Sequence, residues 1–205
     1  MDGLFITFEG GEGSGKTTQI ARLADYLKKK GHTVLETREP GGTFVGEAIR
    51  SILLSGEEDL APKTELFLFL ANRVQHLEEV ILPALQNHTI VLCDRFSDST
   101  LVYQGMVRGI PFEAVNKISH FATEGLEPNM TFLLDINVKK SRARLANREE
   151  RNRYDLAAEE FHQQIRDGYL ALAKKNPNRI RVIRADLPER RVFIEIRKEI
   201  DDLLQ

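Results

Sequence analysis

Cysteine is nearly absent from this chain of 205 residues, which contains only Cys93. A single cysteine rules out a disulfide within the chain, and with it the class of small secreted domains that disulfides hold together. Cys93 lies inside an apolar run, where a small buried thiol is the ordinary interpretation. We therefore expect a reducing compartment, the cytoplasm, as the location of the protein.

The chain also lacks an excess of positive charge and a long apolar stretch. Its formal net charge is -2, whereas a surface that binds nucleic-acid polymers is usually basic. No apolar stretch is long enough to cross a bilayer, and no basic segment precedes a long apolar one near the N-terminus. The five histidines have no spacing typical of metal ligands, and we assign them no role. We expect neither nucleic acid nor a membrane as a partner.

Short apolar runs alternate with helical patterns along the chain. The runs predict strands at residues 4–8, 33–37, 89–93, 130–135 and 179–183. Helical spacing of apolar residues appears near 45–53, 66–83, 111–122, 138–146, 157–175 and 188–204. This alternation predicts one α/β domain over residues 1–205, with a parallel sheet covered by helices on both faces. Ligands of such sheets bind at the carboxyl ends of the strands.

Residues 10–17 match the phosphate-binding pattern G-x-x-x-x-G-K-[ST] at every fixed position. The octet lies between a predicted strand and a predicted helix, so backbone N–H groups and a helix N-terminus converge there. Its glycines permit unusual dihedrals and close backbone approach. The residues predicted to bind a nucleotide polyphosphate are Gly10, Gly11, Glu12, Gly13, Ser14, Gly15, Lys16, Thr17 and Thr18. A chance glycine turn is the weaker interpretation.

Metal and phosphate contacts are predicted at the same sheet edge. Lys16 can contact the β- and γ-phosphates, and the Thr17 hydroxyl can bind Mg²⁺. Asp94 and Arg95 follow the predicted strand at 89–93. Asp94 can hold Mg²⁺ beside Thr17, and Arg95 can bind a phosphate through two hydrogen bonds. The alternative, an ordinary surface Asp–Arg pair, is weakened by the phosphate loop upstream.

Arg38 and Glu12 are two further candidates near this edge. Arg38 belongs to the segment 37–43, which follows the second predicted strand and adds a cation there. The Pro-Gly-Gly in this segment is equally consistent with a plain strand-to-helix turn. Glu12 lies within the phosphate loop, where it can reach a neighbouring substrate or simply face solvent.

A third group of residues is suited to a nucleobase. Thr100 and Gln104 are four residues apart and share a helix face, as do Phe69 and Arg73. The amide of Gln104 offers a donor and an acceptor, while Phe69 can stack on a base and Arg73 can donate to its carbonyl. Tyr103 provides a flat wall with a polar tip. The alternatives are a solvated polar helix for Thr100 and Gln104, and core packing for Phe69.

The segment around 142–154 is dense in arginine and is predicted to form a small mobile lid inserted in the domain. The arginines are Arg142, Arg144, Arg148, Arg151 and Arg153. Residues 147–152 lack apolar periodicity, so we expect them to be mobile. A mobile basic segment can close over a triphosphate and neutralise charge in the transition state. A solvated charged helix, with Glu149 and Glu150 interspersed, is the alternative.

Taken together, these segments resemble the bacterial thymidylate kinases. The resemblance rests on residues 5–17, 37–42, 94–96 and 99–105, and the spacing fits over essentially the whole chain. It implies a P-loop NTPase fold, a three-layer α/β/α arrangement with a five-stranded parallel sheet. It also implies transfer of the γ-phosphoryl group of ATP to dTMP with Mg²⁺, giving dTDP for dTTP synthesis, by a homodimer packed through helices.

The same resemblance implies roles for individual residues. By position, Lys16 and Thr17 resemble the ATP and Mg²⁺ contacts, and Arg38 and Arg95 resemble the dTMP phosphate contacts. The residues that resemble thymine and sugar contacts are Phe69, Arg73, Thr100, Gln104 and, beside the sugar 2′ position, Tyr103. The phosphate loop contains no arginine. The chain therefore resembles the bacterial subtype in which lid arginines assist transfer, with Arg148, Arg151 and Arg153 as candidates.

Two other functions share parts of this pattern. Another nucleoside monophosphate kinase would have the same phosphate loop, Asp94-Arg95 and lid, and only the predicted base contacts argue against it. A GTP-dependent switch needs an N/T-K-x-D segment after a strand, and Asn137-Val138-Lys139-Lys140 lacks the aspartate. A second anion site and an arginine-rich lid also favour an enzyme over a switch.

Overall fold

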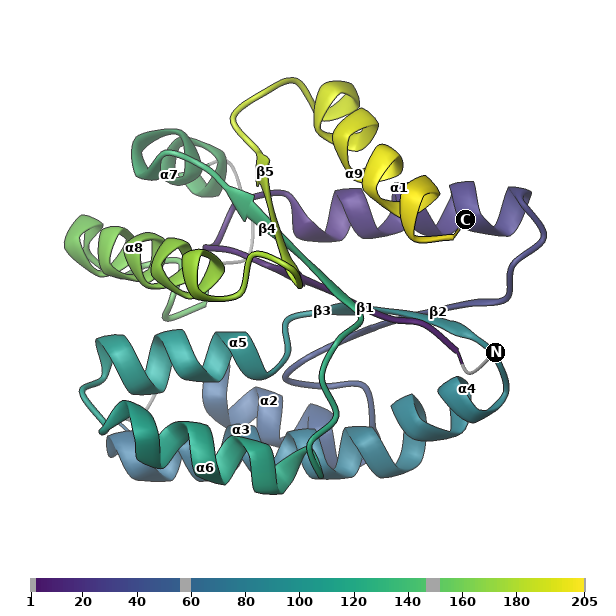
Figure 1. The fold of residues 1–205 in the computed structure, drawn as a ribbon. Coiled ribbons are helices and arrows are strands. Elements are labelled where there is room, and N and C mark those ends of the chain that lie inside the picture. The colour runs from purple at the N-terminus through teal and green to yellow at the C-terminus, as the bar shows by residue number, and fades with distance from the viewer. Residues whose placement is uncertain (1–2, 56–59, 147–151, 205) are drawn as a thin grey trace.

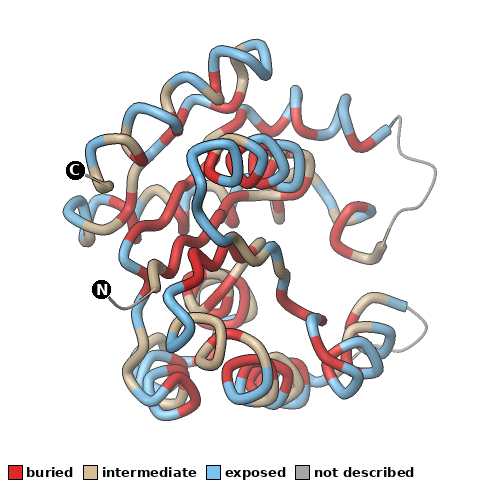
Figure 2. Tube along the Cα trace, turned by 90° about the vertical axis from the view of Figure 1, so that its right-hand side faces the viewer, coloured by how far each residue is buried: buried red, intermediate tan, exposed pale blue. Residues whose placement is uncertain are grey.

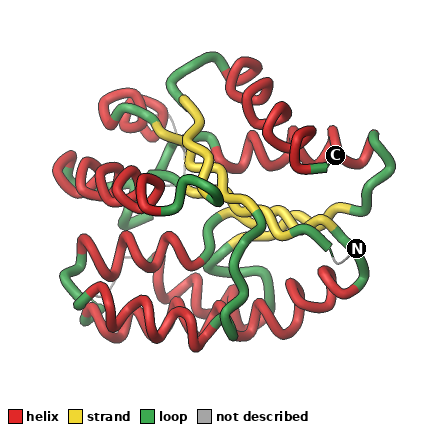
Figure 3. Tube along the Cα trace, in the orientation of Figure 1, coloured by secondary structure: helices red, strands yellow, loops and turns green. Residues whose placement is uncertain are grey.

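A computed structural model of the chain describes residues 3–55, 60–146 and 152–204. Five strands form one sheet in the order β2-β3-β1-β4-β5, with every pair of neighbours parallel. The strands are β1 (Phe5–Glu9), β2 (Val34–Arg38), β3 (Ile90–Asp94), β4 (Met130–Asp135) and β5 (Ile180–Arg184). The sheet runs through the middle of the molecule with helices on both sides (Figures 1 and 3). The predicted three-layer α/β/α fold is confirmed.

Four strands end one residue later than the apolar runs predict, and the added residue is charged each time. These residues are Glu9, Arg38, Asp94 and Arg184, whereas β4 has the predicted bounds. The charged residue still pairs with its neighbour in the sheet, as Phe8 does with Asp94. A hydrophobic pattern cannot include a charged residue at a strand end. The prediction therefore omits the residues at the carboxyl ends of these strands, where ligands of such sheets bind.

The helices cover the two faces in separate groups (Figure 1). On one face, α1 (Lys16–Lys29) packs against α9 (Glu189–Leu203). Figure 1 shows most of the other helical segments on the opposite face. They are α2 (Phe44–Leu54), α3 (Pro62–His76), η1 (Leu77–Ile81), α4 (Leu82–Gln86), α5 (Ser97–Thr100), η2 (Leu101–Val107) and α6 (Phe112–Ala122). The last two, α7 (Val138–Ala146) and α8 (Glu159–Lys175), lie beside β4 and β5.

The core is divided by the sheet, because alternate strand residues point to opposite faces. Ile6 and Phe8 join the apolar cluster under α1 and α9. Phe5 and Cys93 point the other way, toward Phe96. A third cluster lies between α3, η2 and α8. Buried segments therefore occupy the centre of the molecule in Figure 2, and the expected burial of Cys93 is confirmed.

Two details of the helices differ from expectation. Residues 101–107 and 77–81 form π-helical turns within longer helical stretches, an irregularity that apolar spacing does not reveal. Pro111 lies just before α6 as its N-cap rather than in its first turn. In the part of the chain that the structure describes, no helix combines the length and apolarity needed to cross a membrane.

Candidate active site

The phosphate loop lies between β1 and α1, where the sheet meets a helix N-terminus. Gly10, Gly13 and Gly15 have φ values of 132°, 70° and 95°, in the region that side-chain-bearing residues rarely adopt. Gly11 differs, because its φ is not positive and an added Cβ would meet nothing within 4 Å. Gly11 is therefore not required for backbone conformation.

Lys16 opens α1 and turns back over the loop. Its Nζ donates to the carbonyl oxygens of Gly10 and Gly11, each at 3.1 Å. The first turn of α1 contains no acidic residue, and its N-cap makes no side-chain hydrogen bond. The backbone N–H groups of this turn are therefore available to an anionic ligand. Burial, followed by the charge of Arg95, lowers the pKa of Lys16 to about 8. The loop therefore holds a cation that an anionic ligand would stabilise.

Thr17 and Asp94 meet at the junction of α1 and β3. The Thr17 hydroxyl donates to Asp94 Oδ2 at 3.1 Å, so a hydroxyl and a carboxylate oxygen lie side by side. No group of three or more His, Cys, Asp or Glu side chains suited to a metal occurs among the described residues. Mg²⁺ commonly takes one or two protein oxygens together with phosphates and water. The pair fits that kind of site.

Arg95 occupies the first position after β3 and has an unusual positive φ of 73°. Its Nη2 donates to Glu12 Oε1 at 2.8 Å, and its Nη1 lies 3.2 Å from Ser99 Oγ and 3.1 Å from the Tyr169 hydroxyl. The guanidinium also lies over the Tyr103 ring, 5.2 Å from its centroid. Contacts on three sides hold this cation in one orientation, with 16% of its side chain exposed.

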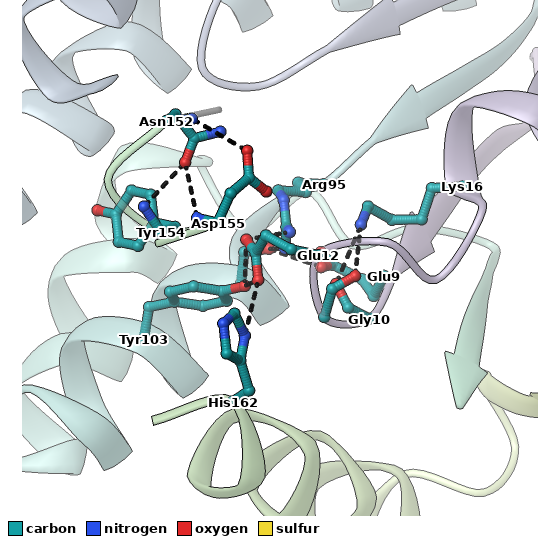
Figure 4. A network of polar contacts seen from close by, with 12 residues as sticks. Glu9, Gly10, Glu12, Lys16, Arg95, Tyr103, Asn152, Tyr154, Asp155 and His162 are labelled. Carbon is teal, nitrogen blue, oxygen red and sulfur yellow. Dashed lines mark hydrogen bonds and ion pairs between the residues drawn. The ribbon is translucent and has the colours of Figure 1, made fainter. Parts of the chain in front are cut away.

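Glu12 is the point at which several of these groups converge (Figure 4). Besides the Arg95 contact, it accepts from the Tyr103 hydroxyl at 2.8 and 2.9 Å. His162 approaches from α8, with Nδ1 3.9 Å from Glu12 Oε2. Burial opposes ionisation of Glu12, but Arg95, Lys16 and Tyr103 outweigh it and hold its pKa below the usual value. Glu12 is therefore an anion that orients Arg95, and not a solvent-facing loop residue.

Glu9, the last residue of β1, lies beneath this cluster. Its carboxylate accepts from the Phe96 N–H at 2.8 Å, from Ser99 Oγ at 2.6 Å and from the Tyr169 hydroxyl at 2.8 Å. Burial, and secondarily the nearby Asp98, raises its pKa to about 7. Because Ser99 and Tyr169 both contact Arg95, Glu9 supports that cation from behind.

The predicted base contacts lie on α3, α5 and η2, and buried carboxylates fasten two of them. Arg73 donates from Nε to Glu39 Oε2 at 2.8 Å and from Nη1 to Thr100 Oγ1 at 2.9 Å. Gln104 donates from Nε2 to Glu65 Oε1 at 2.7 Å. Thr100 and Gln104 are each 1% exposed, so the alternative of a solvated polar helix is wrong.

One cavity of about 510 Å³ brings most of the predicted residues together. Those that line it are Glu12, Gly13, Gly15, Lys16, Thr17, Thr18, Arg38, Phe69, Asp94, Arg95, Thr100, Tyr103 and Gln104. Arg38 is half exposed and donates to Glu47 from the rim. The predicted residues that do not line this cavity are Gly10, Gly11, Ser14, Arg73 and Arg153, and the first two line a separate, smaller pocket. Phe69 lines the larger cavity and also packs against the core, so the core-packing interpretation is confirmed while its stacking on a base stays a prediction.

The arginine-rich segment is described only at its two ends. Arg148 and Arg151 lie outside the described residues. Arg153 donates to Glu65 and to the Tyr154 hydroxyl, on the side of the cavity that contains Gln104. Arg142 is paired with Glu159 at the surface, whereas Arg144 donates to the carbonyl oxygens of Gly13 and Ala185. Arg153 is thus anchored near the predicted base contacts.

Sequence reasoning missed several residues of this site. They are Glu9, Glu39, Arg50, Glu65, His76, His162 and Tyr169, and two of them, Glu39 and Arg50, line the cavity. A signal existed for Glu9 and Glu39, because each is a charged residue next to a strand end in a segment already singled out. No local pattern marks Glu65 or His162. The histidines were assigned no role, yet His76 contacts Glu39 and His162 contacts Glu12.

Comparison with known proteins identifies the family. A sequence model described as thymidylate kinase matches residues 8–196. This chain belongs to the thymidylate kinase family. A thymidylate kinase of Desulfovibrio desulfuricans is 44% identical over 210 aligned residues, which cover 98% of this chain and 97% of that protein. One of Pelotomaculum thermopropionicum is 45% identical, covering 100% of this chain and 95% of that protein.

Solved structures agree with the sequence comparisons. The crystal structure of thymidylate kinase from Ehrlichia chaffeensis superposes with a TM-score of 0.79 at 35% identity, covering 98% of this chain and 99% of that one. The expected resemblance to thymidylate kinases, the fold and the enzyme class, a dTMP kinase, are thereby confirmed. ATP is the phosphoryl donor that this family implies. The alternatives of a different monophosphate kinase and of a GTP switch are set aside.

Proposed function

We propose that this thymidylate kinase transfers the γ-phosphoryl group of ATP to the 5′-phosphate of dTMP within the 510 Å³ cavity, assisted by Mg²⁺. The observation that carries the proposal is Arg95, a braced cation that lines the same cavity as the phosphate loop. Two anion-binding groups at one cavity suit a reaction in which two phosphates must meet. The product, dTDP, would supply dTTP synthesis.

The donor half of the site is the phosphate loop. The loop amides, the N-terminus of α1 and Lys16 bind the ATP phosphates in this proposal. Thr17 and Asp94 offer adjacent oxygens for Mg²⁺, 3.1 Å apart. Mg²⁺ held by these two residues would neutralise negative charge on the donor phosphates. Ser14 and Thr18 belong to the same loop-to-helix turn and complete the predicted ATP contacts.

The acceptor half begins at Arg95 and Arg38. The acceptor is already a phosphate with a second pKa near ~6, so it is largely dianionic at neutral pH and needs no strong general base. The difficulty is the mutual repulsion of two polyanions, which fixed cations and amides reduce. Arg95 grips the dTMP phosphate, Arg38 assists from the rim, and Glu12 keeps Arg95 oriented. These roles agree with a site that is rich in cations and needs no general base.

The thymine and sugar lie beside α3 and η2 in this proposal. Phe69 stacks on the base, and Thr100 and Gln104 hydrogen-bond its edge, with Arg73 behind them. Tyr103, tied to Glu12 through its hydroxyl, crowds the sugar 2′ position. Arg153, together with Arg148 and Arg151, is proposed as the basic lid that closes over the transferring phosphoryl group.

Phosphoryl transfer from ATP to dTMP, dUMP, AMP, CMP and GMP tests the substrate, with and without a Mg²⁺ chelator. We expect transfer to dTMP to exceed the others and to require Mg²⁺. Arg95→Ala should lower kcat/KM for dTMP by ~10²-fold or more, because a charge stabiliser of this kind contributes about 3 kcal/mol or more. Near-normal turnover of that variant would contradict the assignment of Arg95.

A homodimer is the proposed assembly. Apolar side chains on α2 and α3 point outward in the described structure: Phe44 is 93% exposed, Ile52 52% and Phe67 56%. They recur at helical spacing, with Ala48 between the first two and Ala71 and Val74 following Phe67. The two helices also pack against each other, so these exposed side chains come from neighbouring helices. We name this set of side chains the α2–α3 face and propose that a second copy of the chain covers it.

A further inference from the structure

A buried glutamate on α3, Glu65, lies next to the predicted base contacts without lining the cavity. It is 0% exposed and binds three donors. Gln104 Nε2 lies 2.7 Å from Oε1, where Arg108 Nε also donates at 3.4 Å, while Arg108 Nη2 and Arg153 donate to Oε2. Gln104 and Arg153 approach from different elements, η2 and the end of the arginine-rich segment. Glu65 therefore links the predicted base contact to the predicted lid.

The direction of the hydrogen bond between Gln104 and Glu65 is fixed by chemistry. An ionised carboxylate can only accept, so Gln104 must donate with its amide nitrogen. Burial favours the neutral form of Glu65, but hydrogen bonds from Arg108 and Gln104 and the charge of Arg153 outweigh it and lower its pKa. Gln104 itself lines the cavity. Its amide oxygen, which Glu65 cannot bind, is the end left for a ligand.

We propose that Glu65 is a positioning residue for base specificity: it turns the Gln104 carbonyl oxygen into the cavity, so the site selects a pyrimidine with an N3–H. This inference rests on the proposed placement of the base at Gln104. Thymine and uracil carry a hydrogen on N3 and an acceptor oxygen at position 4. Cytosine has the opposite pattern, with an acceptor at N3 and an amine at position 4, and its N3 lone pair faces the Gln104 oxygen.

Thr100 contributes the matching donor. Its hydroxyl oxygen accepts from Arg73 Nη1 at 2.9 Å, which leaves the O–H free to donate. Thr100 lines the cavity, one helical turn from Gln104. Arg73 is held by a second buried carboxylate, Glu39. A donor from Thr100 beside an acceptor from Gln104 matches position 4 and N3 of thymine, and both are oriented by carboxylates behind them.

The Glu65→Gln variant tests the proposal, because it reverses the direction of the hydrogen bond. Arg153 and Arg108 Nη2 both donate to the Oε2 position, whereas only the long 3.4 Å contact of Arg108 Nε reaches Oε1. The new amide oxygen is therefore favoured at the Oε2 position, which places the new NH₂ against Gln104. Gln104 must then turn its own oxygen toward position 65 and present its NH₂ to the cavity. Dissociation constants for dUMP and dCMP, measured by calorimetry, report the change, since these nucleotides differ only at N3 and position 4.

We expect wild type to bind dUMP at least ~10-fold more tightly than dCMP, and Glu65→Gln to reduce that ratio by ~10-fold or more. Arg108→Met is the matched control, because it removes a partner of Glu65 and leaves the Gln104 bond intact; its ratio should stay within about twofold of wild type. In a Gln104→Met background, Glu65→Gln should change the ratio no further. Glu65→Asp, which keeps an acceptor-only group, should restore part of the selectivity.

The outcomes separate this inference from the proposed function. If Gln104→Met changes the ratio but Glu65→Gln does not, the role of Glu65 is overturned while the base placement stands. If Gln104→Met leaves the ratio unchanged, the placement of the base is overturned and the inference with it. Should Glu65→Gln fail to fold, wild type still decides: equal binding of dUMP and dCMP would overturn the proposed orientation of Gln104.

Discussion

Lys16 and Glu9 are both buried ionisable side chains, and for each the charged form is disfavoured because it is held away from water. Burial lowers the pKa of Lys16 to about 8 and raises that of Glu9 to about 7. Each shift favours the neutral form, and each residue lies within the cluster that surrounds Arg95. Shifts of this size are typical of sites that are built for a charged ligand. They also make the protein sensitive to pH in two separable ways.

Lys16 should limit activity on the alkaline side. Because its pKa is about 8 in the protein without nucleotide, kcat/KM for ATP should fall as the pH rises through about 8. The value of kcat should fall less, since bound phosphates favour the protonated lysine. Steady-state rates between about pH 6.5 and 9.5 measure both. Lys16→Arg stays charged over this range, so its kcat/KM should be lower but flat. A wild-type profile without an alkaline limb contradicts the prediction.

Glu9 should affect stability rather than rate. Its pKa is raised from 4.5 to about 7, so the folded state binds this proton more tightly than the unfolded chain does. The resulting stabilisation is complete below pH 4.5 and is lost as the pH rises through about 7. Relative to Glu9→Gln, wild type should lose roughly 3 to 4 kcal/mol of unfolding free energy across this range.

Urea unfolding of both proteins at a series of pH values measures this difference. Subtracting the variant removes the contribution of groups that titrate in both proteins. A difference between wild type and Glu9→Gln that does not change with pH would show that Glu9 keeps an ordinary pKa.

At the scale of elements, the contact between α8 and η2 positions the site. Tyr169 of α8 reaches Glu9, Ser99 and Arg95, while η2 carries Tyr103 and Gln104. Gly168 allows the two helices to approach closely, because an added Cβ would lie 2.9 Å from Val102 Cγ1 and 3.2 Å from Met106 Sδ. The glycine is therefore required by helix packing and not by its own backbone conformation.

Gly168→Ala should separate α8 from η2. Val102 is stiff about χ1 and cannot easily move aside, so we expect a loss of about 1 to 2 kcal/mol despite the better helix propensity of alanine. This corresponds to a fall in Tm of roughly 2 to 8 °C, measured by calorimetry. Gly105→Ala on η2 is the matched control. Its Cβ would have ordinary contacts at 3.6 Å or more, so its Tm should stay the same or rise.

At the scale of the molecule, the α2–α3 face is the main surface without an explanation inside the chain. Adjacent faces of two packed helices expose Phe44, Ile52 and Phe67, although a monomer gains by burying such groups. Arg38 is the last residue of β2 and Arg50 lies on α2, and both line the cavity. A partner on this face would therefore also hold the acceptor side of the site in place.

Phe67→Asp should convert the proposed dimer into a monomer. A charge in the centre of an apolar interface loses burial and remains without a partner, which costs several kcal/mol per interface. Light scattering after gel filtration gives the mass of each species, with 23.3 kDa expected for one chain. Ile194→Asp on α9 is the control, because Ile194 is exposed to a similar degree but lies off the face. A monomeric wild-type protein would overturn the assembly.

Much of this protein follows from local sequence patterns. The strands, the helices and the phosphate loop depend on spacing along the chain, so the fold and the positions of Lys16, Asp94 and Arg95 could be predicted. Four strands extend one residue beyond the apolar pattern, because a charged residue at each end pairs in the sheet without contributing to that pattern. Residue chemistry alone left Gln104 open between a nucleobase contact and a solvated glutamine, and the resemblance made it a predicted thymine contact.

Only the tertiary structure decided which charges are buried together. Glu9, Glu39 and Glu65 look like ordinary acidic residues in the sequence, yet each contacts partners that lie 34 to 160 positions away along the chain. Burial and long-range pairing depend on how helices cross the sheet, which no short window of sequence contains. The residues proposed to contact a phosphate could therefore be predicted from the sequence, whereas the residues that orient them are evident only in the folded chain.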